Sequence, residues 1–267
     1  MIRNILTIAG SDPSGGAGIQ ADIKAIAANG GYAMAALTAL TAQNTIGVTG
    51  VEFIRPDFVA AQITAIREDI RIDAVKIGML GNAETVTAVA GALRGLDAPI
   101  VLDPVMVAKA GDRLLLAEAV EALRAELLPL ATIITPNLPE SADLLEMDHA
   151  ASRSEMRAQA HALLASGCGA VYLKGGHLGG NDSPDLLVTP TAEAWFEGRR
   201  LPTRNTHGTG CTLSSALATR LAQSADLQIA ASMARDYTLA AIAAADRLDV
   251  GHGHGPLHHF SDLWPPS

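Results

Sequence analysis

The sequence has few aromatic residues and few cysteines. Phe, Trp and Tyr make up 3% of its 267 residues although 49% are hydrophobic, so a core must be built from Ala, Leu, Ile and Val. Small aliphatic side chains of this kind suit helices packed over a parallel sheet. The two cysteines, Cys168 and Cys211, lie far apart in the chain, which argues against a disulfide framework and against a cysteine-rich zinc site.

The sequence also lacks an excess of basic residues and long apolar runs. Its net charge is −9, whereas a nucleic-acid-binding surface needs a basic stripe. ATP binding stays possible, since backbone amides and one lysine can outweigh the global field locally. No run of 18 apolar residues lacks charge or glycine, and residues 1–6 lack the features of a signal peptide. We therefore expect a cytoplasmic protein that acts on a small molecule and contacts neither nucleic acid nor membrane.

Short apolar runs alternate with longer segments of helical periodicity. This order predicts an α/β fold with a largely parallel sheet covered by helices on both faces. No Pro/Ser/Gly-rich or charged linker interrupts the middle, so residues 1–267 are expected to form one domain. The tail from residue 251 onward looks irregular. The expected parallel strands are residues 5–9, 74–77, 100–102, 132–134 and 171–173, the expected antiparallel edge strands are 186–189 and 194–197, and the expected helices are 17–29, 58–70, 83–93, 115–127, 152–165, 211–223 and 227–248.

Polar or glycine-rich clusters follow the carboxyl ends of several expected strands. Open α/β sheets bind ligands at that edge. Turn chemistry alone does not explain several independent clusters on one edge, so together they predict a ligand site there. The clusters are residues 10–18, 76–81, 103–107, 137–140 and 174–177.

The strongest single motif is Asn-Thr-His-Gly-Thr-Gly-Cys-Thr at residues 205–212, which leads directly into an Ala/Leu-rich helix. Gly208 and Gly210 permit a tight turn whose amides point one way, and a helix N-terminus adds about half a positive charge. Together they favour binding of an anion, or of the charge that develops on a transferring phosphoryl group. A glycine-rich helix cap is the alternative. Cys211 opens the helix, where a lowered thiol pKa would suit a base, or it is a small buried hydrophobe.

A second glycine-rich loop, residues 10–18, follows the first expected strand. Asp12 and Pro13 interrupt any dinucleotide-binding fingerprint, and residues 36–40 supply no acidic residue after a second strand. No Gly-Lys-Ser/Thr follows, so the loop is not a Walker A motif. The glycines of this loop indicate instead that another group lies close to its backbone, where a side chain would not fit.

Two further strand ends carry candidate ligands for a nucleotide and its metal. Asn137 and Glu140 lie three residues apart at a helix start, where they hold a hydrated Mg²⁺ with its phosphates or simply cap the helix. Lys174, followed by two glycines, offers a phosphate contact or is a solvated surface charge. The tail contains histidines whose spacing matches no standard zinc pattern, at positions 252, 254, 258 and 259.

Taken in order, these motifs are similar to those of one known family, the hydroxymethylpyrimidine/phosphomethylpyrimidine kinases of thiamine biosynthesis, in the ribokinase-like superfamily. The similarity covers about residues 5–260, and the ending Gly-His-Gly-His-Gly-Pro at 251–256 also resembles that of the family. An ordered set is far more specific than any one motif. The set comprises residues 10–22, 41–45, 76–80, 103–106, 135–140, 174–177 and 207–212.

The resemblance implies a ribokinase-like three-layer α/β/α fold. It also implies two ATP-dependent transfers, which convert 4-amino-5-hydroxymethyl-2-methylpyrimidine to its monophosphate and then to its diphosphate, with ATP and Mg²⁺ as cofactors. A homodimer is expected. The pyrimidine-contacting glutamine corresponds to Gln43, whose amide offers both a donor and an acceptor. The other implied substrate positions are Gly10, Asp22, Met79 and Val105, the catalytic positions are Gly208, Thr209, Gly210 and Cys211, and the nucleotide positions are Lys174, Asn137 and Glu140, of which Asn137 and Glu140 also face the metal through water.

Sugar kinases of the same fold usually carry an aspartate base where this chain has Cys211. A thiol is a weaker base at pH 7. Loose phosphoryl-transfer transition states need little deprotonation of the nucleophile, so positioning and electrostatics are expected to provide most of the rate.

Three rival functions fit some of the same residues. Pyridoxal kinases look as if they carry an additional cysteine in the loop after Asp-Pro-Val, and residues 107–112 contain none here. A Cys–His hydrolase would use Cys211 with His207 but leaves the nucleotide positions unexplained. A nucleotide-sensing module would bind ATP and form no product.

Overall fold

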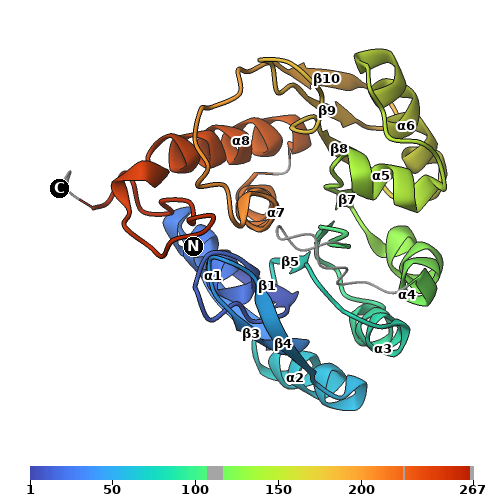
Figure 1. Ribbon diagram of the computed structural model, residues 1–267. Coiled ribbons are helices and arrows are strands. Elements are labelled where there is room, and N and C mark those ends of the chain that lie inside the picture. Colours follow the sequence, from blue (N-terminus) through green and yellow to red (C-terminus); the bar gives the residue numbers. More distant parts are fainter. Residues whose placement is uncertain (107–116, 225, 265–267) are drawn as a thin grey trace.

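The computed structural model describes residues 1–106, 117–224 and 226–264, and its centre is an eight-stranded sheet (Figure 1). The strand order is β10-β9-β8-β7-β6-β5-β1-β2, and every pair from β2 to β8 is parallel. The expected edge strands β9 and β10 are antiparallel. The strands are β1 (Arg3–Ala9), β2 (Gly31–Leu37), β5 (Ala74–Ile77), β6 (Ile100–Leu102), β7 (Ile133–Ile134), β8 (Val171–Lys174), β9 (Asp185–Val188) and β10 (Glu193–Phe196).

Helices cover both faces of this sheet, so the chain has the expected three layers (Figure 1). Side chains alternate between the two faces of a strand. Accordingly, Ile5 of β1 packs in one core cluster, whereas Leu6 and Ile8 pack in the other. On the Ile5 side lie α1 (Gly18–Ala28), α7 (Thr209–Gln223) and α8 (Leu227–Ala243), and on the other lie α2 (Pro56–Asp69), α3 (Ala83–Leu93), α4 (Ala117–Ala122), α5 (Leu138–Leu145) and α6 (Arg153–Ala165).

Helix boundaries differ from the expected ones where the last turn changes type. The segment after α4 continues as a π-helical turn, Leu123–Leu127, and then a 3-10 turn, Leu128–Leu130. The helix expected to run to residue 248 ends at Ala243 and is followed by a 3-10 turn, Ala245–Arg247. Periodicity does not distinguish these turns from a continuing α-helix, because their hydrogen bonds shift by only one residue.

A two-stranded antiparallel sheet lies apart from the main sheet. It is formed by β3 (Ala39–Gln43) and β4 (Val48–Phe53), and the sequence analysis did not anticipate this hairpin. The backbone N–H of Ser11 donates to the carbonyl of Ala39 at 2.8 Å, so the hairpin is attached to the loop that follows β1. Gln43 therefore lies beside the edge where the expected ligand clusters meet.

The tail is irregular, as expected, but it is docked on the molecule. His254 N–H donates to the Thr45 carbonyl at 2.9 Å, and His207 N–H donates to the Gly255 carbonyl at 3.1 Å. The tail thus joins the end of the β3–β4 hairpin to the loop before α7. Across the described ranges, no helix combines the length and apolar character that crossing a membrane requires.

Candidate active site

The expected clusters meet because the strands that carry them are parallel neighbours. The chain enters the sheet at β1, adds β2 on one side and then continues from β5 on the other. The boundary between β1 and β5 is therefore a topological switch point, where α/β sheets form a crevice at the carboxyl ends of their strands. The loops that follow β1 and β5 border this crevice, and the N-terminus of α7 reaches it.

The α7 N-terminus has the geometry of an anion site. Gly208 is its N-cap, with a left-handed φ of 81° that favours glycine. The first N–H groups of an α-helix have no intrahelical partner, so the amides of Gly210 and Cys211 face out of the helix end. Gly210 is not in the left-handed region. Its role is close approach, because a Cβ there would lie 3.1 Å from Lys174 Nζ.

The two glycine-rich loops pack directly on one another. A Cβ on Gly208 would collide with the carbonyl oxygen of Gly16, and a Cβ on Gly16 would collide with the His207 ring. The expected close approach at residues 10–18 is therefore made by the loop before α7. These glycines let the chain position the anion site against the loop after β1.

Lys174 lies beside the anion site between two carboxylates. Its Nζ is 3.1 Å from Asp103 Oδ1 and 3.8 Å from Glu140 Oε2. Burial lowers the pKa of Lys174, but Asp103 and Glu140 outweigh it and raise that pKa, so the lysine stays a cation. Asp103 is 1% exposed and also accepts hydrogen bonds from Thr135 and Ser214. Ser214 is on α7, so Asp103 contacts both Lys174 and the helix that carries the anion site.

Asp103 was not among the residues to which the sequence analysis assigned a site role. The only sequence signal was its position, directly after β6 within an expected ligand cluster. Its contacts with Lys174 join segments 71 residues apart, which no local pattern reveals.

Asn137 and Glu140 form a complete capping box at the start of α5. Asn137 N–H donates to Glu140 Oε2 at 2.8 Å, and Glu140 N–H donates to Asn137 Oδ1 at 2.9 Å. The capping interpretation is therefore confirmed. Burial raises the pKa of Glu140 to about 7; Lys174 opposes this rise and Asp103 adds to it.

The acidic side chains fit a metal that keeps much of its own water. The described residues hold no cluster of three or more His, Cys, Asp or Glu side chains that could cage an ion. Mg²⁺ does not require such a cage, since it is usually bound by one or two carboxylates together with substrate phosphates. Asp103 and Glu140 flank Lys174 and supply carboxylates of that kind.

Cys211 differs from its sequence-based expectation. A helix N-terminus was expected to lower the pKa of its thiol, but burial raises that pKa to about 11. The Lys76 cation opposes the rise, whereas Asp22 and Asp103 add to it. At neutral pH the side chain is a neutral thiol, because desolvation outweighs the nearby cation and the helix end.

A fully buried ion pair lies beneath this region. Lys76 Nζ is 2.9 Å from both carboxylate oxygens of Asp22, and both side chains are 0% exposed. Thr7 and Ser215 also donate to Asp22 at 2.6 and 2.7 Å. The resemblance implied that Asp22 lines the substrate pocket. The structure favours a structural role instead, because both of its carboxylate oxygens are hydrogen-bonded and its side chain is 0% exposed.

Two of the other implied substrate positions, Gly10 and Met79, lie at the start of the β3–β4 hairpin. Gly10 and Met79 touch closely, since a Cβ on Gly10 would lie 2.6 Å from Met79 Cε. Thr38 donates to the Met79 carbonyl at 2.7 Å, which attaches the loop after β5 to the hairpin that carries Gln43. Val105 follows β6 and is partly buried.

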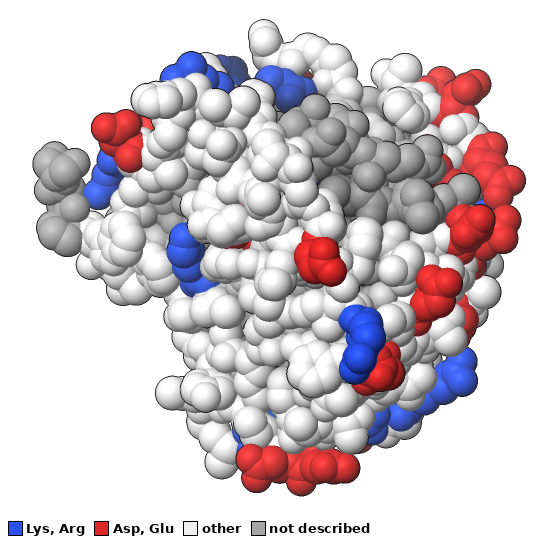
Figure 2. Space-filling view, turned by 60° about the horizontal axis from the view of Figure 1, so that its bottom comes forward, with Lys and Arg blue, Asp and Glu red and all other residues white. Residues whose placement is uncertain are grey.

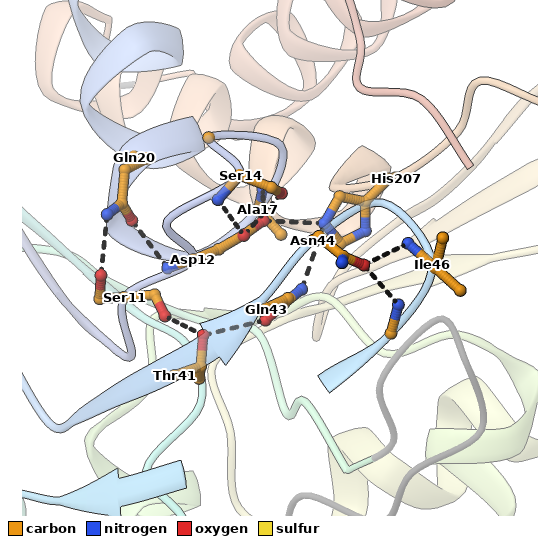
Figure 3. Close-up of polar contacts among 12 residues, drawn as sticks. Ser11, Asp12, Ser14, Ala17, Gln20, Thr41, Gln43, Asn44, Ile46 and His207 are labelled. Atoms are coloured by element: carbon orange, nitrogen blue, oxygen red, sulfur yellow. Dashed lines mark hydrogen bonds and ion pairs between the residues drawn. The ribbon is translucent and has the colours of Figure 1, made fainter. Parts of the chain in front are cut away.

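Asp12 and His207 link the loop after β1 to the loop before α7 (Figure 3). His207 Nε2 lies 2.8 Å from Asp12 Oδ2 and 3.4 Å from Gln43 Nε2. His207 Nε2 is therefore paired with Asp12 rather than with Cys211. The sequence analysis considered His207 only as a partner of Cys211. Its contact with Asp12 spans 195 residues, and no local sequence pattern predicts a pair so far apart.

The fold and the site together are those of an α/β enzyme in which a helix N-terminus suited to an anion lies beside a partly buried lysine. Comparison with known proteins specifies the family. The sequence model of the phosphomethylpyrimidine kinase family matches residues 12–258, and the chain belongs to that family.

The relatives and solved structures agree with this assignment. The chain is 52% identical to the hydroxymethylpyrimidine/phosphomethylpyrimidine kinase of Escherichia coli (strain K12), over 98% of each chain. A crystal structure of phosphomethylpyrimidine kinase from Clostridium difficile 630 superposes with a TM-score of 0.80 at 40% identity, over 90% of this chain and 99% of that one. An ADP complex of Bacillus subtilis pyridoxal kinase gives a TM-score of 0.88 at 34% identity, over 98% of each chain. The expected kinase class and ribokinase-like fold are thereby confirmed.

Proposed function

We propose that the chain transfers phosphoryl groups from ATP first to 4-amino-5-hydroxymethyl-2-methylpyrimidine and then to its monophosphate, in thiamine diphosphate biosynthesis. The observation that carries the proposal is the α7 N-terminus, which lies directly beside Lys174 and Asp103, while Gln43 contacts His207 in the loop that leads into this helix. Close full-length relatives named for both hydroxymethylpyrimidine and phosphomethylpyrimidine kinase activity support it. One continuous sheet also supports a single kinase domain over residues 1–267.

On the nucleotide side, Lys174 is proposed to contact the transferring phosphate. When the phosphate arrives, this cation can exchange its contact with a carboxylate for one with a phosphate oxygen. Backbone amides from Gly208 to Cys211 would stabilise charge on the phosphoryl group as it transfers. Mg²⁺ would neutralise the ATP phosphates, held through water by Glu140 and Asn137 with Asp103 nearby.

On the acceptor side, Gln43 is proposed to pair with the edge of the pyrimidine ring. Its amide supplies one donor and one acceptor, which matches an amino group beside a ring nitrogen. Gly10 lets the ring approach the backbone, and Met79 and Val105 would cover its apolar surface. These contacts orient the hydroxymethyl group toward the anion site, so the chemistry depends mainly on positioning.

A pyridoxal kinase activity is the second candidate, because several superposed structures are pyridoxal kinases. Their identity to this chain is 31–34%, below the 52% shared with the pyrimidine kinase of Escherichia coli. The cysteine-free loop that favoured the pyrimidine, residues 107–112, lies outside the described residues. Pyridoxal is therefore proposed as the weaker substrate of the two.

A homodimer is proposed through the β3–β4 hairpin. Figure 2 turns forward the lower side of Figure 1, where this hairpin and α2 lie, and charged side chains are sparse over the middle of that face. Leu40, Val51 and Phe53 of the hairpin are exposed large hydrophobic residues, and so is Phe58 of α2. A second copy of the chain would cover an apolar surface of this kind. Sedimentation velocity tests this, and a monomer at micromolar concentration would refute it.

A phosphorus NMR time course tests the proposed function. With the pyrimidine alcohol, ATP and Mg²⁺, a monophosphate signal should rise first and a diphosphate signal should follow as ADP accumulates. ATP consumption without either product would refute the proposal.

Gln43→Ala tests the acceptor side separately. Loss of the amide should weaken pyrimidine binding by about 1–3 kcal/mol, because it leaves a ring group unpaired. ATP affinity should stay nearly unchanged. Calorimetry with each ligand measures both affinities, and equal losses would mean that Gln43 has a structural role.

A further inference from the structure

The surroundings of Gln43 contain a hydrogen-bonding conflict. Gln43 Nε2 lies 3.4 Å from His207 Nε2, and His207 Nε2 lies 2.8 Å from Asp12 Oδ2 (Figure 3). An ionised carboxylate only accepts hydrogen bonds, so the ring nitrogen that faces it carries a hydrogen. That nitrogen has no lone pair left to accept from an amide N–H.

Asp12 is held in the ionised, accepting state. Its Oδ1 accepts from the backbone and the hydroxyl of Ser14 at 2.9 and 2.7 Å, and its Oδ2 accepts from Ala17 N–H at 2.8 Å. Burial raises its pKa, but the hydrogen bonds from His207, Ser14 and Ala17 lower it below the usual value. His207 must therefore donate to Asp12 at neutral pH.

Thr41 imposes a second, independent condition. Its Oγ1 lies 2.9 Å from the carbonyl oxygen of Ser11 and 3.2 Å from Gln43 Oε1. The hydroxyl has one hydrogen, and the carbonyl is the nearer acceptor and can only accept. With that hydrogen on Ser11, Thr41 presents lone pairs to the amide and needs an N–H there.

Both neighbours therefore favour the opposite amide orientation. The oxygen and nitrogen of an amide are similar in size and are distinguished by their partners, and a half-turn exchanges them. We propose that Asp12, acting through His207, holds the Gln43 amide with its oxygen toward the imidazole. Thr41 receives the amide nitrogen on the other side. His207 and Thr41 are thus positioning residues that determine which ring pattern Gln43 accepts.

This orientation leaves a defined pattern for a ligand. One amide N–H is used by Thr41, and one oxygen lone pair faces the His207 Nε2–H, which donates mainly to Asp12 at 2.8 Å and is shared with the amide oxygen at 3.4 Å. The second N–H and the second lone pair stay available on the half-buried Gln43. Resting on the proposed function, the inference is that an amino group beside an accepting ring nitrogen fits this pattern. The 4-oxo analogue, with a carbonyl beside a ring N–H, shows the inverse pattern and fits only if the amide turns.

The test compares kcat/KM of the full chain for the 4-amino substrate and for its 4-oxo analogue, with ATP saturating. The wild type should prefer the amino ring by about 100-fold or more, because the inverse ring leaves buried polar groups unpaired. His207→Leu and Thr41→Val each release the amide, so each should reduce this preference by about tenfold or more. His207→Gln keeps an N–H near the Nε2 position and should retain the preference.

Thr49→Val is the matched control, since it makes the same change on β4, where the hydroxyl donates to the Ala42 carbonyl. It should leave the preference unchanged.

A merely structural role of His207 would lower activity on both rings equally and leave the ratio intact, which would overturn the inference. A wild type that does not distinguish the rings would also overturn it. If the wild type phosphorylates neither ring, the proposed function fails and the inference falls with it. If His207→Leu does not fold, the ratio for Thr41→Val decides.

Discussion

Replacing Cys211 with serine tests how the substrate alcohol loses its proton. Burial raises the pKa of Cys211 to about 11, although the Lys76 cation opposes this rise. At pH 7, about four units lower, the thiolate fraction is about 10⁻⁴. A thiolate base would therefore be almost absent at neutral pH. The anion site and Lys174 act at full strength at that pH, because neither depends on the thiolate.

We expect Cys211→Ser to lose less than about 100-fold in kcat, which is the lower limit of what a general base usually contributes. The wild-type kcat should not rise tenfold per pH unit between pH 7 and 9. The assay is kcat against pH for both proteins, followed by ADP release, with circular dichroism to show that both fold.

A different result would refute this reasoning. If the wild-type kcat rises tenfold per unit toward the thiol pKa, and Cys211→Ser loses several hundred-fold together with that slope, then the thiolate is the base. Electrostatic stabilisation by the α7 N-terminus would then be secondary, as in enzymes whose nucleophile needs prior deprotonation.

Further predictions concern the parts that hold the site in place. Gly208→Ala should lower both activity and melting temperature, because Gly208 has a φ of 81° and a Cβ there would collide with the loop after β1. In contrast, Gly91→Ala on α3, where a Cβ meets nothing within 4 Å, should leave activity unchanged; calorimetric scans of both decide the point. Lys76→Met should cost about 3–5 kcal/mol, since it leaves a buried aspartate unpaired. Arg153→Ala, at an exposed ion pair, should cost far less, and equal costs in urea denaturation would contradict the argument. The pKa of Glu140 is raised from 4.5 to about 7, so the folded state binds this proton more tightly than the unfolded state. Its stabilising contribution is therefore full below about pH 4.5 and is lost as the pH rises through about 7. Melting temperatures of Glu140→Gln should lack this slope, and identical pH profiles would count against the raised pKa.

Most of the layered fold follows from the sequence, because its signals are local. The strands at 74–77 and 100–102 and the helix at 83–93 have the expected boundaries. Burial on both faces gives parallel strands continuous apolar runs, and α3 has an apolar stripe, so short windows suffice. The β3–β4 hairpin was missed because its sequence does not follow its burial. On β3 the apolar Leu40 and Ala42 are exposed while the polar Thr41 and Gln43 are partly buried, and β4 is almost wholly exposed, so the usual apolar–polar alternation of a strand is absent.

The candidate site divides in the same way. The glycine-rich loops and the capping box at Asn137 are recognisable in the sequence, since backbone conformation and helix starts depend on neighbouring residues. Their meeting at one edge also follows, because parallel strands end on the same side of a sheet.

The electrostatics of the site were decided only by the tertiary structure. Asp103 is a site residue because it pairs with Lys174, and His207 is one because it pairs with Asp12. Asp22 is fully buried, where it forms an ion pair with Lys76. The thiol of Cys211 titrates about two units above its ordinary pKa of 9.0, at about 11, instead of below it, because of burial. Desolvation and charge pairing depend on side chains from segments far apart in the chain, and their distances are set by packing.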